Sequence, residues 1–200
     1  MADTRAFFDG IASAWDARVA TQSFLERLRA AVDDLGVRSD EHVLDLGCGT
    51  GNLTLVLLER MAPAGRVTAV DFSDAMLTLA RGKIADPRVE WVSADAKELP
   101  LPDASVDRVI CFSAWPHFTE HPRVAAGLFR VTRPGGAVHV LHIDGRETIN
   151  QVHRDAGAVV AHHALREASA LSALFASVGF EEIEHTDTAD RYLVTVRRPG

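Results

Sequence analysis

A glycine-rich stretch, VLDLGCGTGNLT at residues 43–54, constrains the fold of this 200-residue chain more than any other feature. The apolar residues of a predicted buried strand run into Gly47, Gly49 and Gly51, and Asp45 stands two positions ahead of the first glycine. Glycine lets the backbone adopt positive φ values and leaves no Cβ between the main chain and a ligand. A helix that begins directly after such a turn presents free N–H groups to an anion. The stretch therefore predicts a strand, a ligand-binding turn and a helix.

Short apolar, β-branched runs alternate with helical patterns along the rest of the chain. The predicted strands cover residues 42–46, 66–71, 88–95, 107–113 and 137–143, and the predicted helices cover residues 7–18, 22–35, 53–61, 74–84 and 122–132. Strands that alternate with helices form a parallel sheet with helices on both faces, joined by right-handed crossovers.

The C-terminal part of the chain has a different pattern. An apolar helical stripe from Leu171 to Val178 ends at Gly179, and the runs EEIEHTD and RYLVTVRR follow with only Thr188–Asp190 between them. A connection this short permits a hairpin and excludes a parallel crossover. We therefore predict an α/β, Rossmann-like, doubly wound sheet of seven strands, mostly parallel, with an antiparallel last hairpin strand and helices on both faces.

The chain contains no internal repeat and no linker-like stretch, which predicts a single domain over residues 1–200. Within it we expect an N-terminal helical cover (1–36), a cofactor-binding core (37–145), and an acceptor-side insert with the C-terminal hairpin (146–200).

Charge and composition exclude several classes of partner. The formal net charge is −7 and no basic run occurs, which disfavours a nucleic-acid partner. The longest apolar stretches are only strand-sized, so we expect no membrane insertion.

The first twenty residues contain Asp3, Asp9 and Asp16 and lack an apolar signal core, which predicts a cytoplasmic protein. Cys48 and Cys111 indicate neither a disulfide framework nor a paired-cysteine zinc site.

The glycine spacing distinguishes between nucleotide cofactors. A dinucleotide fingerprint, G-x-G-x-x-G, would require glycine where this chain has Asn52, which argues against a nicotinamide oxidoreductase. A phosphate-binding loop would require a lysine in the turn, and none is present. The observed pattern, G-x-G-x-G preceded by Asp45, resembles the first motif of the class I S-adenosylmethionine-dependent methyltransferases.

The resemblance covers roughly residues 5–197 and includes later motifs in the expected order. VTAVDFSDAML places Asp71 at the end of the second strand, VSADAKELPLPDASVDRVICF resembles the adenine-contacting segment, and VTRPGGAVHVLHI resembles the loop and fifth strand. FFDGIASAWD resembles the N-terminal helix that covers the cofactor in small-molecule C- and N-methyltransferases, the branch that includes quinone and biotin-precursor enzymes.

The resemblance implies S-adenosylmethionine as cofactor and S-adenosylhomocysteine as product. It also implies a role for each matching residue. Gly47 and its neighbours Cys48, Gly49 and Asn52 approach the methionyl part of the cofactor, and Asp45 helps to hold its ammonium group. Asp71 accepts hydrogen bonds from the ribose hydroxyls, and Phe72 and Met76 pack against adenine. Asp95 and the Ala96 N–H form hydrogen bonds with the edge of the adenine ring, and Phe112 faces the reactive methyl group.

Histidines mark the predicted acceptor side. His117 follows the strand at 107–113, His142 ends the strand at 137–143, and His153 lies in the insert. The carboxyl ends of these strands face the ligand crevice, so we take the three as catalytic candidates. Three interpretations stay open: histidines without a site role, a base or hydrogen-bond donor for an acidic acceptor, and a metal cluster completed by His162 or His163. No tight ligand spacing supports a metal, and none is assigned.

Aromatic residues complete the expected acceptor site. Phe7, Phe8, Trp15, Trp115 and Phe118 are candidates for its lining. We predict methyl transfer to a small-molecule acceptor by direct displacement, in a monomer or homodimer. The alternatives are a non-catalytic S-adenosylmethionine-binding protein and a methyltransferase-fold protein that uses a histidine-bound metal.

Overall fold

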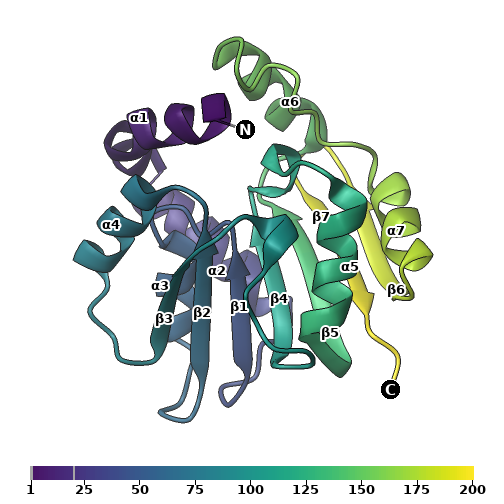
Figure 1. Ribbon diagram of the computed structural model, residues 1–200. Helices are drawn as coiled ribbons and strands as arrows, with labels where there is room; N and C mark the ends of the chain where they lie inside the picture. The colour runs from purple at the N-terminus through teal and green to yellow at the C-terminus, as the bar shows by residue number, and fades with distance from the viewer. Residues whose placement is uncertain (1, 20) are drawn as a thin grey trace.

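The protein forms a three-layer α/β structure with one central sheet (Figure 1). The computed structural model describes residues 2–19 and 21–200. The sheet contains seven strands in the order β3-β2-β1-β4-β5-β7-β6. Their bounds are β1 His42–Leu46, β2 Arg66–Asp71, β3 Val89–Ser93, β4 Val106–Phe112, β5 Thr132–His142, β6 Glu181–Asp187 and β7 Tyr192–Arg197.

Strand direction agrees with the lengths of the connections. The pairs β1–β2, β2–β3, β1–β4 and β4–β5 are parallel, whereas β5–β7 and β6–β7 are antiparallel. The predicted fold class, including the reversed last strand, is confirmed. The strand order reverses between β1 and β4, and in such sheets ligands bind outside the carboxyl ends of the strands at this point.

Helices cover both faces of the sheet. Their bounds are α1 Ala2–Val19, α2 Gln22–Asp33, α3 Asn52–Leu58, α4 Asp74–Lys83, α5 His121–Val131, α6 Arg146–Asp155 and α7 Ala168–Ser177, with 3₁₀ turns η1 at Ala96–Glu98 and η2 at Trp115–His117. Ser73 caps α4, since its hydroxyl accepts the Met76 N–H. Among the described helices, none is both long and apolar enough to span a membrane.

Two apolar clusters hold these layers together, because successive residues of a buried strand point to opposite faces. Leu44 and Leu46 of β1 pack in the cluster that includes α5 and α7, whereas Val43 packs in the cluster that includes α2 and α3. Both clusters contain fully buried leucines, and each such side chain contributes roughly 1.5–3 kcal/mol to folding. The sheet is thus a rigid platform for the loops at its carboxyl end.

Two helices lie beyond that end of the sheet, at the top of Figure 1. One is α1, which belongs to the predicted N-terminal cover. The other is α6, a helix that was not predicted. Polar contacts connect α1 to the body: Ser73 Oγ donates to Asp9, and Asp16 accepts from Thr50 Oγ1 (2.6 Å) and Lys83 Nζ (2.7 Å). The space between these two helices and the strand ends contains the candidate site.

Candidate functional site

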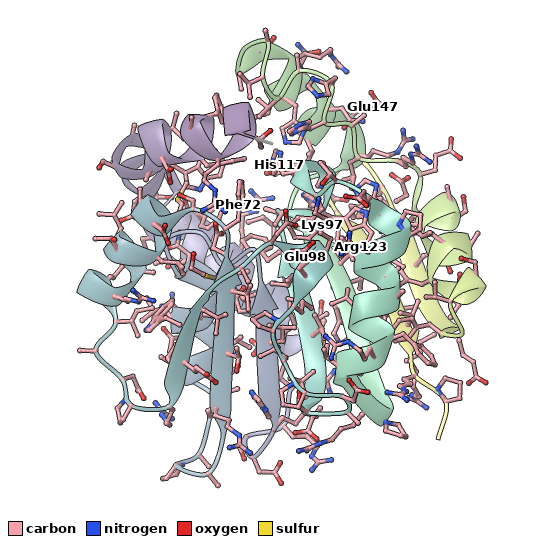
Figure 2. The ribbon with its side chains drawn as sticks, in the orientation of Figure 1. Phe72, Lys97, Glu98, His117, Arg123 and Glu147 are labelled. Carbon is pink, nitrogen blue, oxygen red and sulfur yellow. The ribbon has the colours of Figure 1, made fainter. Side chains whose placement is uncertain are left out.

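A cavity of about 740 Å³ lies at the carboxyl ends of the strands. This volume falls in the upper part of the range for small-molecule sites. Figure 2 shows two of its lining residues, Phe72 and His117, on the side of the sheet that α1 and α6 cover. Of the predicted site residues, the cavity is lined by Gly47, Cys48, Gly49, Asn52, Asp71, Phe72, Met76, Asp95, Ala96, Phe112, His117, His142 and His153.

The glycine turn is anchored to the neighbouring strand. The N–H groups of Gly47 and Cys48 both donate to the carbonyl oxygen of Val70, at 2.8 and 3.0 Å. Gly47 and Gly49 have φ values of +75° and +52°, in the left-handed region that favours glycine. Next to them, Asn52 begins α3 and its side-chain oxygen accepts from Lys83 Nζ at 3.0 Å. The turn is therefore a fixed rim of the cavity.

The carboxylate of Asp71 lies directly beside this rim. One oxygen accepts the Gly49 N–H at 2.8 Å, and the other accepts the Ser73 N–H at 2.9 Å. Burial raises the pKa of Asp71, and the N–H groups that it accepts from act in the opposite direction. An ionised carboxylate has about four acceptor positions, so acceptor capacity stays available beyond these N–H groups. Asp71 can thus bind a pair of hydroxyl groups from the cavity.

Asp45 occupies a different position from the one its predicted role suggests. Its side chain is 1% exposed, and among the described residues it is not one of those that line the cavity. It accepts from Thr54 Oγ1 of α3 at 2.6 Å, and burial raises the pKa of its carboxyl to about 7. Asp45 therefore connects β1 to α3 behind the turn, and its contact with an ammonium group stays a prediction.

The wall beyond Asp71 is flat and largely apolar. Phe72 and the buried Met76 line it, together with Ala96 at the start of η1. Asp95 caps η1 by accepting the Lys97 N–H at 3.1 Å. Phe8 of α1 packs edge-on against Phe72, with 5.9 Å between ring centroids. This combination suits a planar heterocycle with a polar edge.

Imidazoles gather in another part of the cavity wall, where Phe8 packs against His117 as well as Phe72. His117 and His153 have ring centroids 4.7 Å apart, and His117 Nδ1 lies 3.0 Å from the Nδ1 of His163. His153 Nδ1 is hydrogen-bonded to the His163 carbonyl oxygen. Since a carbonyl can only accept, His153 carries its proton on Nδ1 and its Nε2 has a free lone pair. Burial lowers the pKa of His117 and of His153, so both rings are neutral at pH 7.

The metal hypothesis is not supported. The structure brings His117, His142, His153 and His163 to the same region, whereas His162 is exposed and outside the cavity lining. No group of three or more histidine, cysteine or acidic side chains in the described part of the chain is arranged to hold a metal ion. The Nδ1 atoms of His117 and His163 are hydrogen-bonded to each other, and His153 Nδ1 is hydrogen-bonded to the main chain.

Of the five aromatic residues expected at the acceptor site, four line the cavity: Phe7, Phe8, Trp15 and Phe118. The expectation for Trp115 is wrong. Its side chain is 4% exposed and packs in the apolar core against Phe175, because η2 turns it away from the strand ends. Phe24 and Ile149 line the cavity as well and were not predicted.

The comparisons with known proteins identify the family. The family described as "Methyltransferase domain" matches residues 43–136. The ubiquinone/menaquinone biosynthesis C-methyltransferase UbiE of Idiomarina loihiensis is 34% identical over 155 residues, which cover 73% of this chain and 62% of that relative. The chain belongs to the class I S-adenosylmethionine-dependent methyltransferases. It spans less than two thirds of the length of its first curated relatives.

Solved methyltransferase structures show the same fold. A putative methyltransferase of Haloferax volcanii, in complex with the activator Trm112, superposes with a TM-score of 0.79 at 18% identity and covers 96% of this chain and 98% of its own. A SAM-dependent methyltransferase from Aquifex aeolicus superposes with a TM-score of 0.77 at 19% identity, with 94% and 97% covered. At this identity the likeness concerns architecture alone.

The residues of this family member fit the family's cofactor. A Cβ built on Gly49 would meet no atom within 4 Å, so the turn is open toward the cavity there. Asp71 has acceptor capacity for a ribose diol, and Phe72 and Met76 offer a surface for a purine. The sequence alone missed Thr54, which acts through Asp45, and it named His163 only as a possible metal ligand and not as the hydrogen-bond partner of His117 and His153. Only the position of α3 and of the loop after α6 reveals these contacts.

Proposed function

We propose that the chain transfers the methyl group of S-adenosylmethionine to a small-molecule acceptor by direct displacement, with release of S-adenosylhomocysteine. One observation carries this proposal: a single cavity is lined by the glycine turn and Asp71 and also by aromatic rings, His117 and His153. The names of the curated relatives, ubiquinone/menaquinone biosynthesis C-methyltransferases, support a quinone-related ring as acceptor. We further propose a cytoplasmic protein that is a monomer or homodimer.

The bound cofactor supplies an electrophilic methyl group, and the residues of the chain orient the acceptor and exclude water. Holding two reactants in line lowers the barrier by removing their relative freedom of motion. The apolar rings of Phe8, Phe112 and Phe118 contribute the dry walls. An acceptor that must lose a proton also needs a base within reach. His153 Nε2 is suited to this task, because its lone pair is free and its ring is neutral at pH 7.

Thermal melting with added nucleotides tests the cofactor assignment. S-adenosylhomocysteine at a hundred times its dissociation constant should stabilise the fold by about 2.7 kcal/mol. NAD should leave the melting temperature unchanged. Stabilisation by NAD but not by S-adenosylhomocysteine would contradict the proposal.

Turnover is measured by release of S-adenosylhomocysteine in the presence of pooled phenols, reduced quinones, amines and carboxylic acids. We expect release with the phenol or quinol pools. A clear melting shift without turnover on any pool would instead favour the non-catalytic cofactor-binding protein.

A further inference from the structure

Two buried nitrogens of a residue that lines the cavity have no hydrogen-bond partner among the described residues. They are Nδ1 and Nε2 of His142, whose side chain is 1% exposed. The great majority of buried polar side-chain atoms in proteins are hydrogen-bonded, and each unpaired one costs folding free energy. The other histidines at this end differ, since His117 and His153 both form hydrogen bonds to His163.

The sheet fixes the position of His142. It is the last residue of β5 and pairs with Tyr192, the first residue of β7, in the antiparallel register. The two rings meet edge to face at 5.7 Å and 88°. His142 lines the cavity, whereas Tyr192 lies behind it in the apolar core. The imidazole is therefore a rigid part of the cavity floor.

The charge state of His142 restricts what it can bind. Burial, and then the nearby His153, lower the pKa of His142 to about 3. At pH 7 the ring is neutral, with one N–H donor and one bare acceptor nitrogen. A hydroxyl or carbonyl oxygen satisfies such a ring. A carboxylate or phosphate does not, because the ring offers no positive charge to offset the loss of hydration.

We propose that His142 is a specificity-determining residue that hydrogen-bonds a neutral oxygen, a hydroxyl or carbonyl, at the buried end of the acceptor. This inference rests on the proposed function, since it places the acceptor at the histidine end of the cavity. It adds a second polar contact to the base role of His153. It also predicts that analogues with an anion at this position are rejected.

Binding of three fluorescent aromatic probes tests the proposal without turnover. Naphthalene, 1-naphthol and 1-naphthoate are titrated into the protein with the cofactor end filled by S-adenosylhomocysteine. The wild-type protein should bind 1-naphthol about tenfold more tightly than naphthalene, which corresponds to about 1.4 kcal/mol. It should bind 1-naphthoate no more tightly than naphthalene.

Variants assign the preference to the imidazole. His142→Leu should bind 1-naphthol and naphthalene equally, whereas His142→Gln should keep the preference because a carboxamide has both a donor and an acceptor. Tyr192→Phe is the matched control. It removes a buried hydroxyl that, like the nitrogens of His142, has no partner among the described residues. Tyr192 does not line the cavity, so the preference should stay tenfold.

Melting of the ligand-free variants gives a second readout. Removing an unpaired buried polar group is neutral or stabilising. His142→Leu should therefore melt no lower than the wild-type protein and keep its full shift with S-adenosylhomocysteine. A lower melting temperature with an unchanged tenfold preference would assign His142 a purely structural role and overturn the proposal. Equal binding of naphthol and naphthalene to the wild-type protein, tighter binding of naphthoate, or no binding of any probe would also overturn it.

The outcomes separate this inference from the proposed function. Absence of a melting shift with S-adenosylhomocysteine contradicts the proposed function, and the probe titrations are then made without it. A normal shift together with an absent naphthol preference contradicts only the role of His142.

Discussion

The two glycines at the start of the turn are required for different reasons. A Cβ on Gly47 would lie 2.4 Å from the Cβ of Ala114, which is closer than two carbon atoms can approach. A Cβ on Gly49 would meet no atom within 4 Å. Both residues have positive φ, which costs another residue roughly 1–2 kcal/mol. Packing therefore demands glycine at 47, whereas backbone conformation and the approach of a ligand demand it at 49.

Alanine substitution separates these two reasons. Gly49→Ala should destabilise the fold by only about 1–2 kcal/mol and abolish the melting shift with S-adenosylhomocysteine. Gly47→Ala should cost clearly more, because Ala114 or the turn must move. Urea unfolding and nucleotide titration measure the two effects. Equal losses of stability, or a normal nucleotide shift in Gly49→Ala, would contradict this assignment.

The buried carboxyl of Asp45 predicts a pH-dependent contribution to stability. The pKa of the Asp45 carboxyl rises from 3.8 to about 7 on folding. Its contribution to the free energy of unfolding is therefore fully present below pH 3.8 and is lost as pH rises through 7. Asp45→Asn prevents this loss of stability at high pH, because an amide does not ionise, and it keeps an oxygen that can accept from the Thr54 hydroxyl. The variant should gain on the wild-type protein by up to roughly 4 kcal/mol between pH 4 and pH 8. Denaturant unfolding across this range measures the difference, and a constant difference would contradict the prediction.

Sequence motifs indicated which residues lie together where the backbone fixes their positions. Gly47, Gly49 and Asp71 lie on one rim because two adjacent parallel strands end there. Trp115 could not be placed from the sequence, since one 3₁₀ turn decides whether its ring faces the cavity or the core. Asp45 was predicted to hold the ammonium group of the cofactor at the turn. Because side chains alternate between the two faces of β1, the Asp45 side chain points instead to Thr54.

At the scale of elements, the two helices that lie over the cavity, α1 and α6, differ in how readily they could be predicted from the sequence. Strands and most helices were predicted because their apolar periodicity reflects burial on the sheet. Helix α6 escaped because it buries little: within Arg146–Asp155 only His153 is buried. Ile149, Val152 and His153 recur at helical spacing and line the cavity, but the other residues of the helix are polar and the pattern was overlooked. Helix α6 nevertheless brings His153 to the cavity.

The attachment of α1 to the body is polar and can be weakened selectively. Asp16→Ala removes the acceptor for Thr50 and Lys83 at the edge of the turn. Partly exposed contacts of this kind are each worth about 1 kcal/mol or less. We expect S-adenosylhomocysteine to dissociate about three- to tenfold faster, while the melting temperature of the ligand-free protein changes little.

Stopped-flow displacement measures that rate. Glu26→Ala, which removes an exposed side-chain contact with Gln22 within α2, is the control and should leave the rate unchanged. An unchanged rate in Asp16→Ala would show that α1 does not retain the nucleotide.

For the whole molecule, connection lengths made the fold predictable, whereas the network of neutral histidines was visible only in three dimensions. Burial lowers the pKa of His139 and His142 to about 3 each, and it also lowers the pKa of His117. Eight histidines follow Arg108 in the sequence, but nothing in their spacing indicates which of them are buried.

These histidines predict acid sensitivity. Their folded pKa values lie below the unfolded value of 6.5, so the unfolded chain binds more protons as pH falls and stability decreases from about pH 6.5 toward pH 3. His142→Leu should reduce this slope by about one proton, and the exposed His162→Leu should not. Melting temperatures measured from pH 7 to pH 4 test the difference, and parallel curves for all three proteins would contradict it.

The insertion of β7 between β5 and β6 has a consequence for biosynthesis. During translation, the glycine turn and Asp71 leave the ribosome long before Tyr192, which packs behind His142. The nucleotide end of the cavity is thus encoded early, and the floor at the opposite end is completed only when the final hairpin threads into the sheet. A nascent or prematurely terminated chain would contain the residues that line the nucleotide part of the cavity but would lack Tyr192, which packs behind His142.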